Sequence, residues 1–146
     1  MRKAVLVVLL GALALALPAE AGVNAGMRIG YQDPSFCINL LGDFKLTPNI
    51  AISAEFDMIT AGVFMGQFTG NFKYVFSLEG LKPYAGLGAG VVFGGGGAAF
   101  SLPFHVGMRF PLGAGFSLDA DVRPCLWIGE GTYFSFGFLA GVVYTF

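Results

Sequence analysis

The chain of 146 residues carries a formal net charge of −1, and 55% of its residues are hydrophobic while only 12% are charged. That balance excludes a basic nucleic-acid-binding domain, so we expect no nucleic-acid partner. A soluble surface usually has roughly 25–35% charged residues, so either most of this chain is buried or its outside does not face water.

The first 21 residues have the three-part layout of a secretory signal peptide. Arg2 and Lys3 give a basic start, an apolar run extends from Ala4 to Leu17, and Ala19-Glu20-Ala21 has the small-residue spacing of a cleavage site. The run is short for a membrane helix, and an uncleaved anchor is the alternative. We predict a cleaved signal over residues 1–21 and one domain over residues 22–146.

The segment from Pro83 to Phe104 carries no charge and is long enough to be considered as a membrane helix. Its stretch "YAGLGAGVVFGGGGAAFSL" contains seven glycines, each of which costs about 1 kcal/mol in a helix interior. Gly86 and Gly90 form a GxxxG pair, a dimerisation signal in membrane helices, but the other glycines argue against a helix. A dinucleotide-binding loop does not fit either, because Val91 stands where GxGxxG requires its third glycine.

Two-residue alternation with regularly spaced turns describes residues 22–146 better. Seven turn-like clusters give eight segments of about 15 residues, and a tilted membrane strand needs only about 9–11. The clusters are Asp33-Pro34-Ser35, Thr47-Pro48-Asn49, Thr60-Ala61-Gly62, Glu79 to Pro83, Gly94 to Gly97, Pro111 to Gly115 and Gly129-Glu130-Gly131. The sequence therefore predicts an all-β fold, a closed eight-stranded antiparallel up-and-down transmembrane barrel.

Each predicted strand has an apolar face and a polar face. In residues 50–58, for example, Ile52 and Phe56 alternate with Ser53, Glu55 and Asp57. By this alternation all sixteen phenylalanines lie on the apolar faces. Ten charged residues lie on the polar faces, five of each sign: Arg28, Asp43, Lys45, Glu55, Asp57, Lys73, Arg109, Asp119, Asp121 and Arg123.

Alternation alone does not say which face is outside. A soluble lipocalin-like barrel would turn the phenylalanines inward, but an eight-stranded barrel holds only a side-chain filling or one small ligand. Sixteen phenylalanines with their aliphatic neighbours would overfill it, and its outer wall would be glycine-rich and almost uncharged. With the phenylalanine face in lipid both difficulties disappear, and a closed barrel pairs every backbone polar group.

Aromatic residues then lie at the strand ends, as membrane-interface belts require. The periplasmic rim would carry Phe44, Tyr74, Phe76, Phe110, Phe116, Tyr144 and Phe146, and the outer rim Tyr31, Phe36, Phe56, Phe64, Phe93, Phe100 and Phe134.

The closing stretch "FGFLAGVVYTF" resembles the C-terminal assembly signal of bacterial outer-membrane β-barrel proteins, with Phe138, Ala140, Val142, Tyr144 and Phe146 in alternation. "KPYAGLGAGVVF" and "PLGAGFSLDADVR" resemble strand–turn pieces of the small eight-stranded family that includes the OmpA transmembrane domain and the OmpX and OmpW types. This resemblance implies export to a Gram-negative outer membrane. It also implies contact with lipid and lipopolysaccharide, and recognition of the last strand by the barrel-assembly machinery. We expect a monomer without a cofactor or a bound metal.

Two features are unusual for such a barrel. Pro103 and Pro124 fall inside predicted strands, where we expect bulges or irregular pairing. Cys37 and Cys125 point inward near the outer rim. They belong to the second and seventh strands, which are not neighbours, and a disulfide needs Cα atoms within about 7 Å. A disulfide is therefore left open.

For function, the balanced lumen charges predict a paired network that fills the barrel, so the chain would act mainly as a membrane scaffold. Asp43, Lys45, Lys73, Arg109 and Asp119 should lie toward the periplasm, and Glu55, Asp57 and Arg123 nearer the outside. Glycines on the polar faces, at positions 30, 86, 88, 90, 107, 137 and 141, should make room for long side chains or leave small gaps.

The alternatives are a narrow or gated pore and, further away, a lipid A-modifying enzyme of the kind that uses a His–Ser pair. His105, the sole histidine, points inward and is followed at i+2 by Gly107 rather than serine, so we expect no enzymatic activity. The predicted loops on the outer side of the membrane are short, which argues against a role of the protein in adhesion.

Overall fold

The computed structural model describes residues 22–60 and 62–146, so the predicted signal peptide lies outside the described residues. The strands are β1 (Val23–Gln32), β2 (Ser35–Lys45), β3 (Ile50–Thr60), β4 (Phe64–Val75), β5 (Lys82–Gly94), β6 (Gly97–Gly113), β7 (Phe116–Ile128) and β8 (Thr132–Thr145). None of the described residues belongs to a helix that could cross a bilayer.

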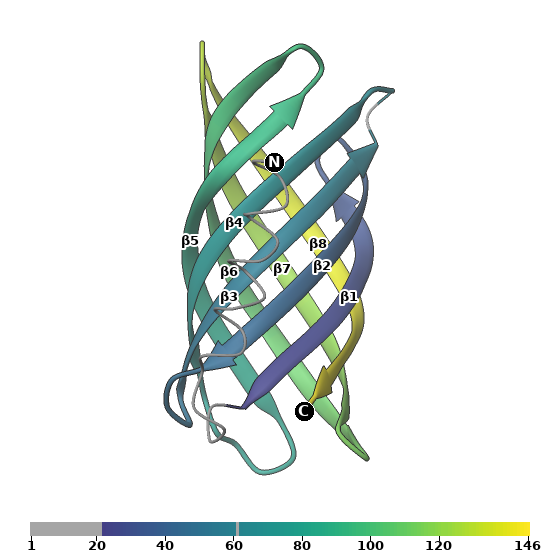
Figure 1. Ribbon diagram of the computed structural model, residues 1–146, viewed down its shortest axis with the longest axis vertical. Coiled ribbons are helices and arrows are strands. Elements are labelled where there is room, and N and C mark those ends of the chain that lie inside the picture. Colours follow the sequence, from purple (N-terminus) through teal and green to yellow (C-terminus); the bar gives the residue numbers. More distant parts are fainter. Residues whose placement is uncertain (1–21, 61) are drawn as a thin grey trace, which may run out of the picture.

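All eight strands pair antiparallel with their sequence neighbours, and β8 pairs with β1, so the sheet closes into a tilted barrel (Figure 1). Six of the seven predicted turn clusters fall between strands or overlap strand ends by no more than three residues, and the seventh, Thr60-Ala61-Gly62, includes the undescribed residue 61. The uncharged segment 83–104 forms β5 and the start of β6. The predicted eight-stranded barrel is therefore confirmed.

The two ends of the barrel differ, and each keeps one name below. The C-terminal end carries Phe146, the start of β1 and the β2–β3, β4–β5 and β6–β7 connections (Figure 1). The far end carries the other four connections, including the glycine turn between β5 and β6.

The prolines interrupt pairing without changing its register. Between β6 and β7 the ladder runs to Pro103↔Cys125 and resumes at Val106↔Val122 in the same register. The ladder between β5 and β6 is likewise interrupted between Gly90↔Ser101 and Leu87↔Phe104. The expectation of bulges or irregular pairing at these prolines is thus confirmed, in the form of irregular pairing without a bulge. The register shift lies between Pro111 and Gly113, next to a turn, where an extra residue is accommodated without disturbing the middle of the barrel.

Inward glycines allow neighbouring backbones to approach closely. A Cβ at Gly90 would lie 2.0 Å from the Phe68 carbonyl oxygen, and one at Gly141 would lie 1.9 Å from that of Met27. Other glycines make room for side chains, as predicted: a Cβ at Gly107 would meet the Tyr84 ring, and one at Gly86 would lie 2.9 Å from Lys73 Cγ. The inward glycines therefore serve both the curvature of the wall and the filling of the lumen.

Candidate functional site

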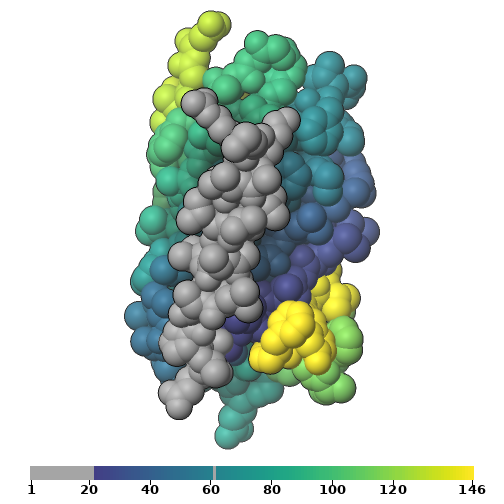
Figure 2. Space-filling model, in the orientation of Figure 1, coloured from purple at the N-terminus to yellow at the C-terminus, as the bar shows by residue number. Residues whose placement is uncertain are grey.

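The outer wall of the barrel is apolar. All sixteen phenylalanines lie in the described part of the chain; fourteen are exposed, two are half-buried and none is buried. Figure 2 shows one face of this wall, with the C-terminal residues at its lower end. The alternative of a soluble lipocalin-like barrel, in which the phenylalanine rings would fill the interior, is therefore excluded.

Aromatic pairs mark the C-terminal end of this wall. At the C-terminal end, Phe116 packs against Tyr144 with ring centroids 4.8 Å apart, and Tyr144 packs against Phe146 at 4.9 Å. Tyr74 and Phe76 form a further edge-on pair at 5.0 Å. These pairs lie at strand ends, as the aromatic belts of membrane barrels do.

The interior is polar and tightly filled. Nineteen polar or charged residues are buried in the described part of the chain, and eight of them, together with the half-buried Arg109, form an ion-pair network that we call the lumen network. Its members are four cations and five carboxylates: Arg28, Lys73, Arg109 and Arg123 with Asp43, Glu55, Asp57, Asp119 and Asp121. All nine are residues that the alternation assigned to the lumen.

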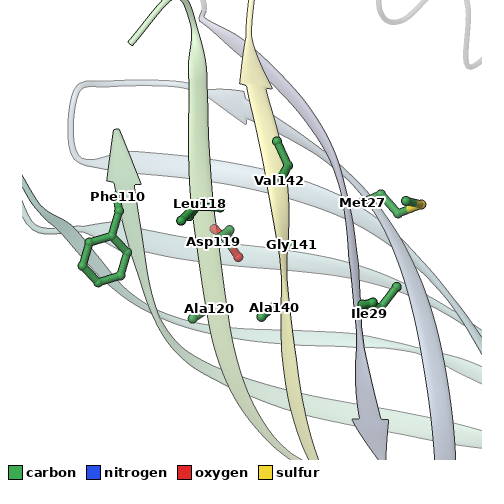
Figure 3. A pocket seen from close by; sticks show the side chains of 9 residues that line it. All are labelled: Met27, Ile29, Phe110, Leu118, Asp119, Ala120, Ala140, Gly141 and Val142. Atoms are coloured by element: carbon green, nitrogen blue, oxygen red, sulfur yellow. The ribbon is translucent and has the colours of Figure 1, made fainter. Parts of the chain in front are cut away.

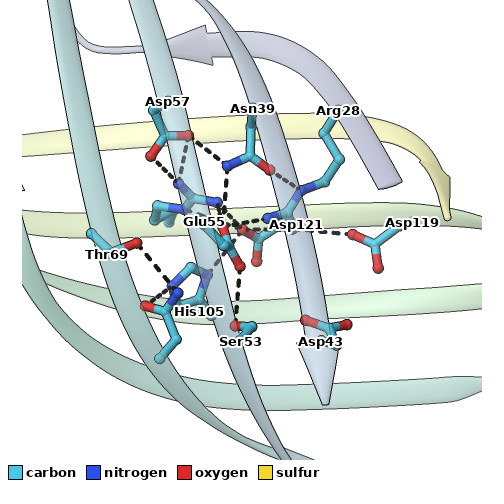
Figure 4. A network of polar contacts seen from close by, with 12 residues as sticks. Arg28, Asn39, Asp43, Ser53, Glu55, Asp57, Thr69, His105, Asp119 and Asp121 are labelled. Atoms are coloured by element: carbon cyan, nitrogen blue, oxygen red, sulfur yellow. Dashed lines mark hydrogen bonds and ion pairs between the residues drawn. The ribbon is translucent and has the colours of Figure 1, made fainter. Parts of the chain in front are cut away.

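Glu55 on β3 is the centre of the lumen network (Figure 4). Its Oε2 accepts from Arg28 and from Arg123, both at 2.6 Å, and its Oε1 accepts from Lys73 Nζ at 2.6 Å. One carboxylate therefore bonds to three cations from three other strands. This arrangement satisfies charges that would be costly to leave unpaired in a dry interior.

Toward the far end, Arg123 holds two more carboxylates. Its NH1 donates to Asp57 Oδ2 at 2.8 Å and its NH2 donates to Asp121 Oδ2 at 3.1 Å. Asp57 also accepts from the Asn39 amide at 2.7 Å, but Arg123 is its sole ion-pair partner among the described residues. Asp57 thus depends on a single cation.

Toward the C-terminal end, the lumen network is built around Asp43 and Asp119. Arg109 NH2 lies 2.9 Å from both carboxylates, and Lys73 Nζ lies 3.3 Å from Asp43 Oδ1. The Tyr84 hydroxyl donates to Asp119 at 3.0 Å, and its ring lies 5.3 Å from Lys73 Nζ. The predicted placement of these charges toward one end is thus observed.

Lys45, the tenth predicted lumen residue, lies apart from the others. It is half-buried at the last position of β2 and forms no ion pair with the described residues. It lines a small cavity of about 30 Å³ at the C-terminal mouth, together with Lys73, Lys82, Arg109 and Asp43. The sequence predicts five cations and five carboxylates in the lumen, whereas the lumen network contains four cations and five carboxylates.

His105 lies inside the barrel, as its position in β6 predicts. Its Nδ1 lies 3.1 Å from Asp121 Oδ2 and its Nε2 lies 3.0 Å from Asn71 Oδ1. The ring is buried and both nitrogens are occupied, with no serine among the described hydrogen-bond partners. Within residues 22–60 and 62–146 there is also no group of three His, Cys, Asp or Glu side chains that could hold a metal ion.

The far end of the lumen is closed by apolar side chains that the sequence analysis did not anticipate. We call this cluster the apolar cap: Cys37, Ile59, Val92, Cys125, Trp127 and Leu139, with Met65 and Ala99 packed against it. Both cysteines are buried and free, so this structure contains no disulfide between them. The signal was available, because Ile59 and Trp127 continue the inward alternation of Asp57 and Cys125.

Four buried polar atoms have no hydrogen-bond partner in the described part of the chain: Gln32 Oε1, Gln67 Nε2, Ser101 Oγ and Asp121 Oδ1. Gln67 reaches the apolar cap, since its Oε1 accepts from the Trp127 indole at 2.9 Å, and Ser101 is paired with Trp127 across β6 and β7. Hydrogen-bonding capacity therefore remains in the lumen wall beside the cap.

A surface groove lies on the outside of the barrel. It has a volume of about 620 Å³, and Figure 3 shows its lining across β1, β6, β7 and β8. Small residues at its floor, Ala120 and Ala140, lie between larger side chains such as Phe110, Leu118 and Met27. This groove is part of the apolar outer wall.

Four of the predicted assembly-signal residues lie on the outer face of β8, and the fifth, Phe146, directly follows the strand. Phe138, Val142 and Phe146 are exposed, as is Ala140, and Tyr144 is half-buried against its aromatic neighbours. The backbone of β8 pairs with β7 on one side and with β1 on the other. Both edges of the strand are therefore occupied once the barrel is closed.

Comparison with solved structures identifies the fold class. The N-terminal β-barrel domain of Pseudomonas aeruginosa OprF superposes with a TM-score of 0.75 at 14% identity, covering 86% of this chain and 98% of that one. Neisserial surface protein A gives 0.62 at 15% identity, with 86% and 96% covered. The outer membrane enzyme PagL gives 0.56 at 14% identity, with 83% and 98% covered.

The chain thus has the fold of the small eight-stranded outer-membrane β-barrels, and the family resemblance seen in the sequence is confirmed at the level of fold. No protein-family model and no curated protein sequence matches it. Because the identities are 14–15% for these three, function has to be argued from the lumen and the surface.

Proposed function

We propose that the protein is an integral β-barrel of the bacterial outer membrane whose closed lumen makes it mainly a structural, scaffolding component. One observation carries this proposal: the phenylalanines are outside and the ion pairs are inside, the reverse of a water-soluble protein. An exposed apolar wall of this extent would aggregate in water, whereas in a bilayer it contacts acyl chains.

The filled lumen favours a scaffold over a conduit. The lumen network crosses the barrel from β1 to β3 and β7, and the apolar cap closes the far end. An ion passing through would have to separate buried ion pairs and then displace apolar side chains. Both steps are unfavourable in a narrow interior.

The orientation and partners follow from the same proposal. The C-terminal end would face the periplasm after export, and the far end would face the outside among lipopolysaccharide. The barrel-assembly machinery would recognise β8 before closure, when the edges that later pair with β1 and β7 are free. The folded protein would be a monomer, because the barrel has no unpaired strand edge.

Three measurements test the proposal. The protein should fractionate with outer membranes, and the folded barrel should migrate differently on a gel before and after boiling. The refolded protein in a planar bilayer should give no regular conductance steps. Recovery of a soluble folded protein without detergent would contradict membrane integration, and steady single-channel conductance would contradict the scaffold role.

A narrow or gated pore is the alternative function, favoured by two observations. The C-terminal mouth has a cation-lined cavity, and unpartnered polar atoms lie farther along the lumen. A pore requires salt-dependent single-channel conductance that changes when Arg123 or Glu55 is neutralised. A silent bilayer with protein shown to be folded would refute it.

We also propose that the barrel is not an enzyme, although PagL shows that this fold can carry one. The sole histidine, His105, is buried in the lumen and bonded to Asp121 and Asn71, away from the lipid face. Altered lipid A in cells expressing the protein, lost on His105→Ala, would contradict this proposal.

A further inference from the structure

A cup of about 500 Å³ opens at the far end of the barrel, above the apolar cap. Its most buried lining residues are Trp127 and Val92, which we take as the floor, and its exposed rim is formed by the turns Gly94–Gly97 and Gly129–Gly131. Small-molecule sites have volumes of about 300–1,000 Å³, are mainly apolar, and occur in the mouths of β-barrels. The cup fits that description.

Aromatic rings dominate one side of the cup. The Trp127 and Tyr133 ring centroids are 5.5 Å apart with an interplanar angle of 37°. Both rings are held by their polar groups: the indole N–H donates to Gln67, and the Tyr133 hydroxyl donates to Asp33. The π-faces available here are therefore fixed in place before any ligand arrives.

The charge at this end is negative. Glu130 is the one charged residue that lines the cup, and the Asp33 carboxylate lies beyond Tyr133. Over residues 22–60 and 62–146, no lysine, arginine or histidine forms an ion pair with either carboxylate. Lys45 and Lys82 lie at the opposite mouth. An anion would be repelled from the cup, and a cation would be attracted.

The glycine turn keeps the cup open. Gly94, Gly95 and Gly96 all have positive φ, at 127°, 61° and 90°, and a Cβ at Gly94 would lie 2.3 Å from the Phe64 carbonyl oxygen. Side chains are strongly disfavoured at these positions. The tip between β5 and β6 therefore places no side chain over the cup.

We propose that this cup binds small organic cations with an apolar body, of the substituted-ammonium class. The aromatic faces would stabilise the positive charge by cation–π contact, Glu130 would supply the opposite charge, and the apolar floor would pack against the ligand body. A bare metal ion does not fit, because the lining offers a single carboxylate and no group of metal-binding side chains was found in the described chain.

The sequence provides a specific reporter, because Trp127 is the sole tryptophan of the chain. The experiment titrates refolded protein in micelles of an uncharged maltoside detergent, which carries no ammonium group, with benzyltrimethylammonium and follows tryptophan fluorescence. Neopentylbenzene, in which carbon replaces the charged nitrogen, is the matched neutral probe. We expect a saturable change with the cation and about tenfold weaker binding of the neutral probe. Binding in micelles does not depend on where the protein resides in the cell, so this test can fail independently of the membrane proposal.

Two Glu→Gln variants, one at each end of the barrel, test the role of the Glu130 charge. Glu130→Gln should weaken cation binding roughly threefold, and Glu79→Gln, in the β4–β5 turn, should leave it unchanged. Raising the salt from about 0.05 M to about 0.5 M should weaken binding of the cation and not of the neutral probe. This salt test uses the unaltered protein, so it holds even if a variant does not fold.

Three results would overturn the proposal. The first is equal affinity for the charged and neutral probes. The second is cation binding that is unchanged by both Glu130→Gln and salt. The third is a linear fluorescence drift that never saturates, which would mean that the probe only partitions into micelles.

Discussion

Arg123→Met is the sharpest test of the lumen network. Arg123 is fully buried and ion-pairs with Glu55, Asp57 and Asp121. Its removal leaves Asp57 without a cation among the described residues, while Glu55 and Asp121 keep Arg28. Breaking a buried ion pair by removing one partner costs about 3–5 kcal/mol, so we expect a loss of unfolding free energy in that range.

The matched second change is Asp57→Asn. Combined with Arg123→Met, it restores the excess of one carboxylate found in the wild-type lumen network. The double variant should therefore be more stable than the sum of the two single effects predicts, by about 1–3 kcal/mol. Lys45→Met, which removes the lumen-facing lysine outside the network, should change the unfolding free energy by less than about 1 kcal/mol.

Urea titration of the barrel in lipid vesicles, followed by Trp127 fluorescence, measures all four variants with one probe. A gel without boiling confirms that each variant folds before the titration. Strict additivity of Arg123→Met and Asp57→Asn would refute the coupling that the structure shows. A cost of Arg123→Met no larger than that of Lys45→Met would refute the importance of the network.

Two further pairs of substitutions test the wall. Gly90→Ala should destabilise the barrel by about 1–3 kcal/mol in the same urea titration, because its Cβ would lie 2.0 Å from the Phe68 carbonyl oxygen. Gly70→Ala on the neighbouring strand, where no atom lies within 4 Å of the added Cβ, should be neutral, and equal effects would refute the steric argument. Phe104→Arg, in the middle of β6, should cost about 2–4 kcal/mol in bilayers, against about 0–1 for Phe116→Arg at the rim. If Phe104→Arg and Phe116→Arg give the same refolding yield in lipid vesicles, the outer wall does not face lipid.

The faces of the strands could be read from the sequence because alternation is a local signal. Asp119, Asp121 and Arg123 are two residues apart, so placing one in the lumen places all three there. Turns are equally local, since glycine, proline and asparagine mark them directly. These two signals are sufficient to predict the strand count, the strand order and all nine network residues, with Lys45 as the one predicted lumen charge that lies outside the network.

The partners across the lumen could not be read in the same way. Arg123 and Glu55 are 68 residues apart, on β7 and β3, which are not paired in the sheet. Their contact depends on the stagger of the strands and on the width of the barrel, which no short stretch of sequence specifies. Lys45 illustrates the same limit: its alternation is correct, but its position at the end of β2 puts it in the mouth and outside the network.

The apolar cap was missed for a different reason. The inward faces were defined by their charges, so the apolar inward residues Ile59, Val92, Trp127 and Leu139 were not considered as a group. Each follows the alternation of its own strand, and only the closed barrel brings the four together. Along β3 and β7 the inward-facing residues change from charged to apolar toward the far end. This change in the sequence indicates that the far end is closed.

The apolar cap and the lumen network close the lumen by different physical means, so a pore would have to open two barriers. The network is held by charge, so it weakens when a member such as Glu55 is neutralised. The cap is held by apolar packing, so it is insensitive to that change. Neutralising Glu55 alone should therefore leave the barrel closed, because the far end stays blocked. A pore in this protein would require both barriers to open, and conductance that responds only to charge substitutions would mean that the cap is not the barrier the structure shows.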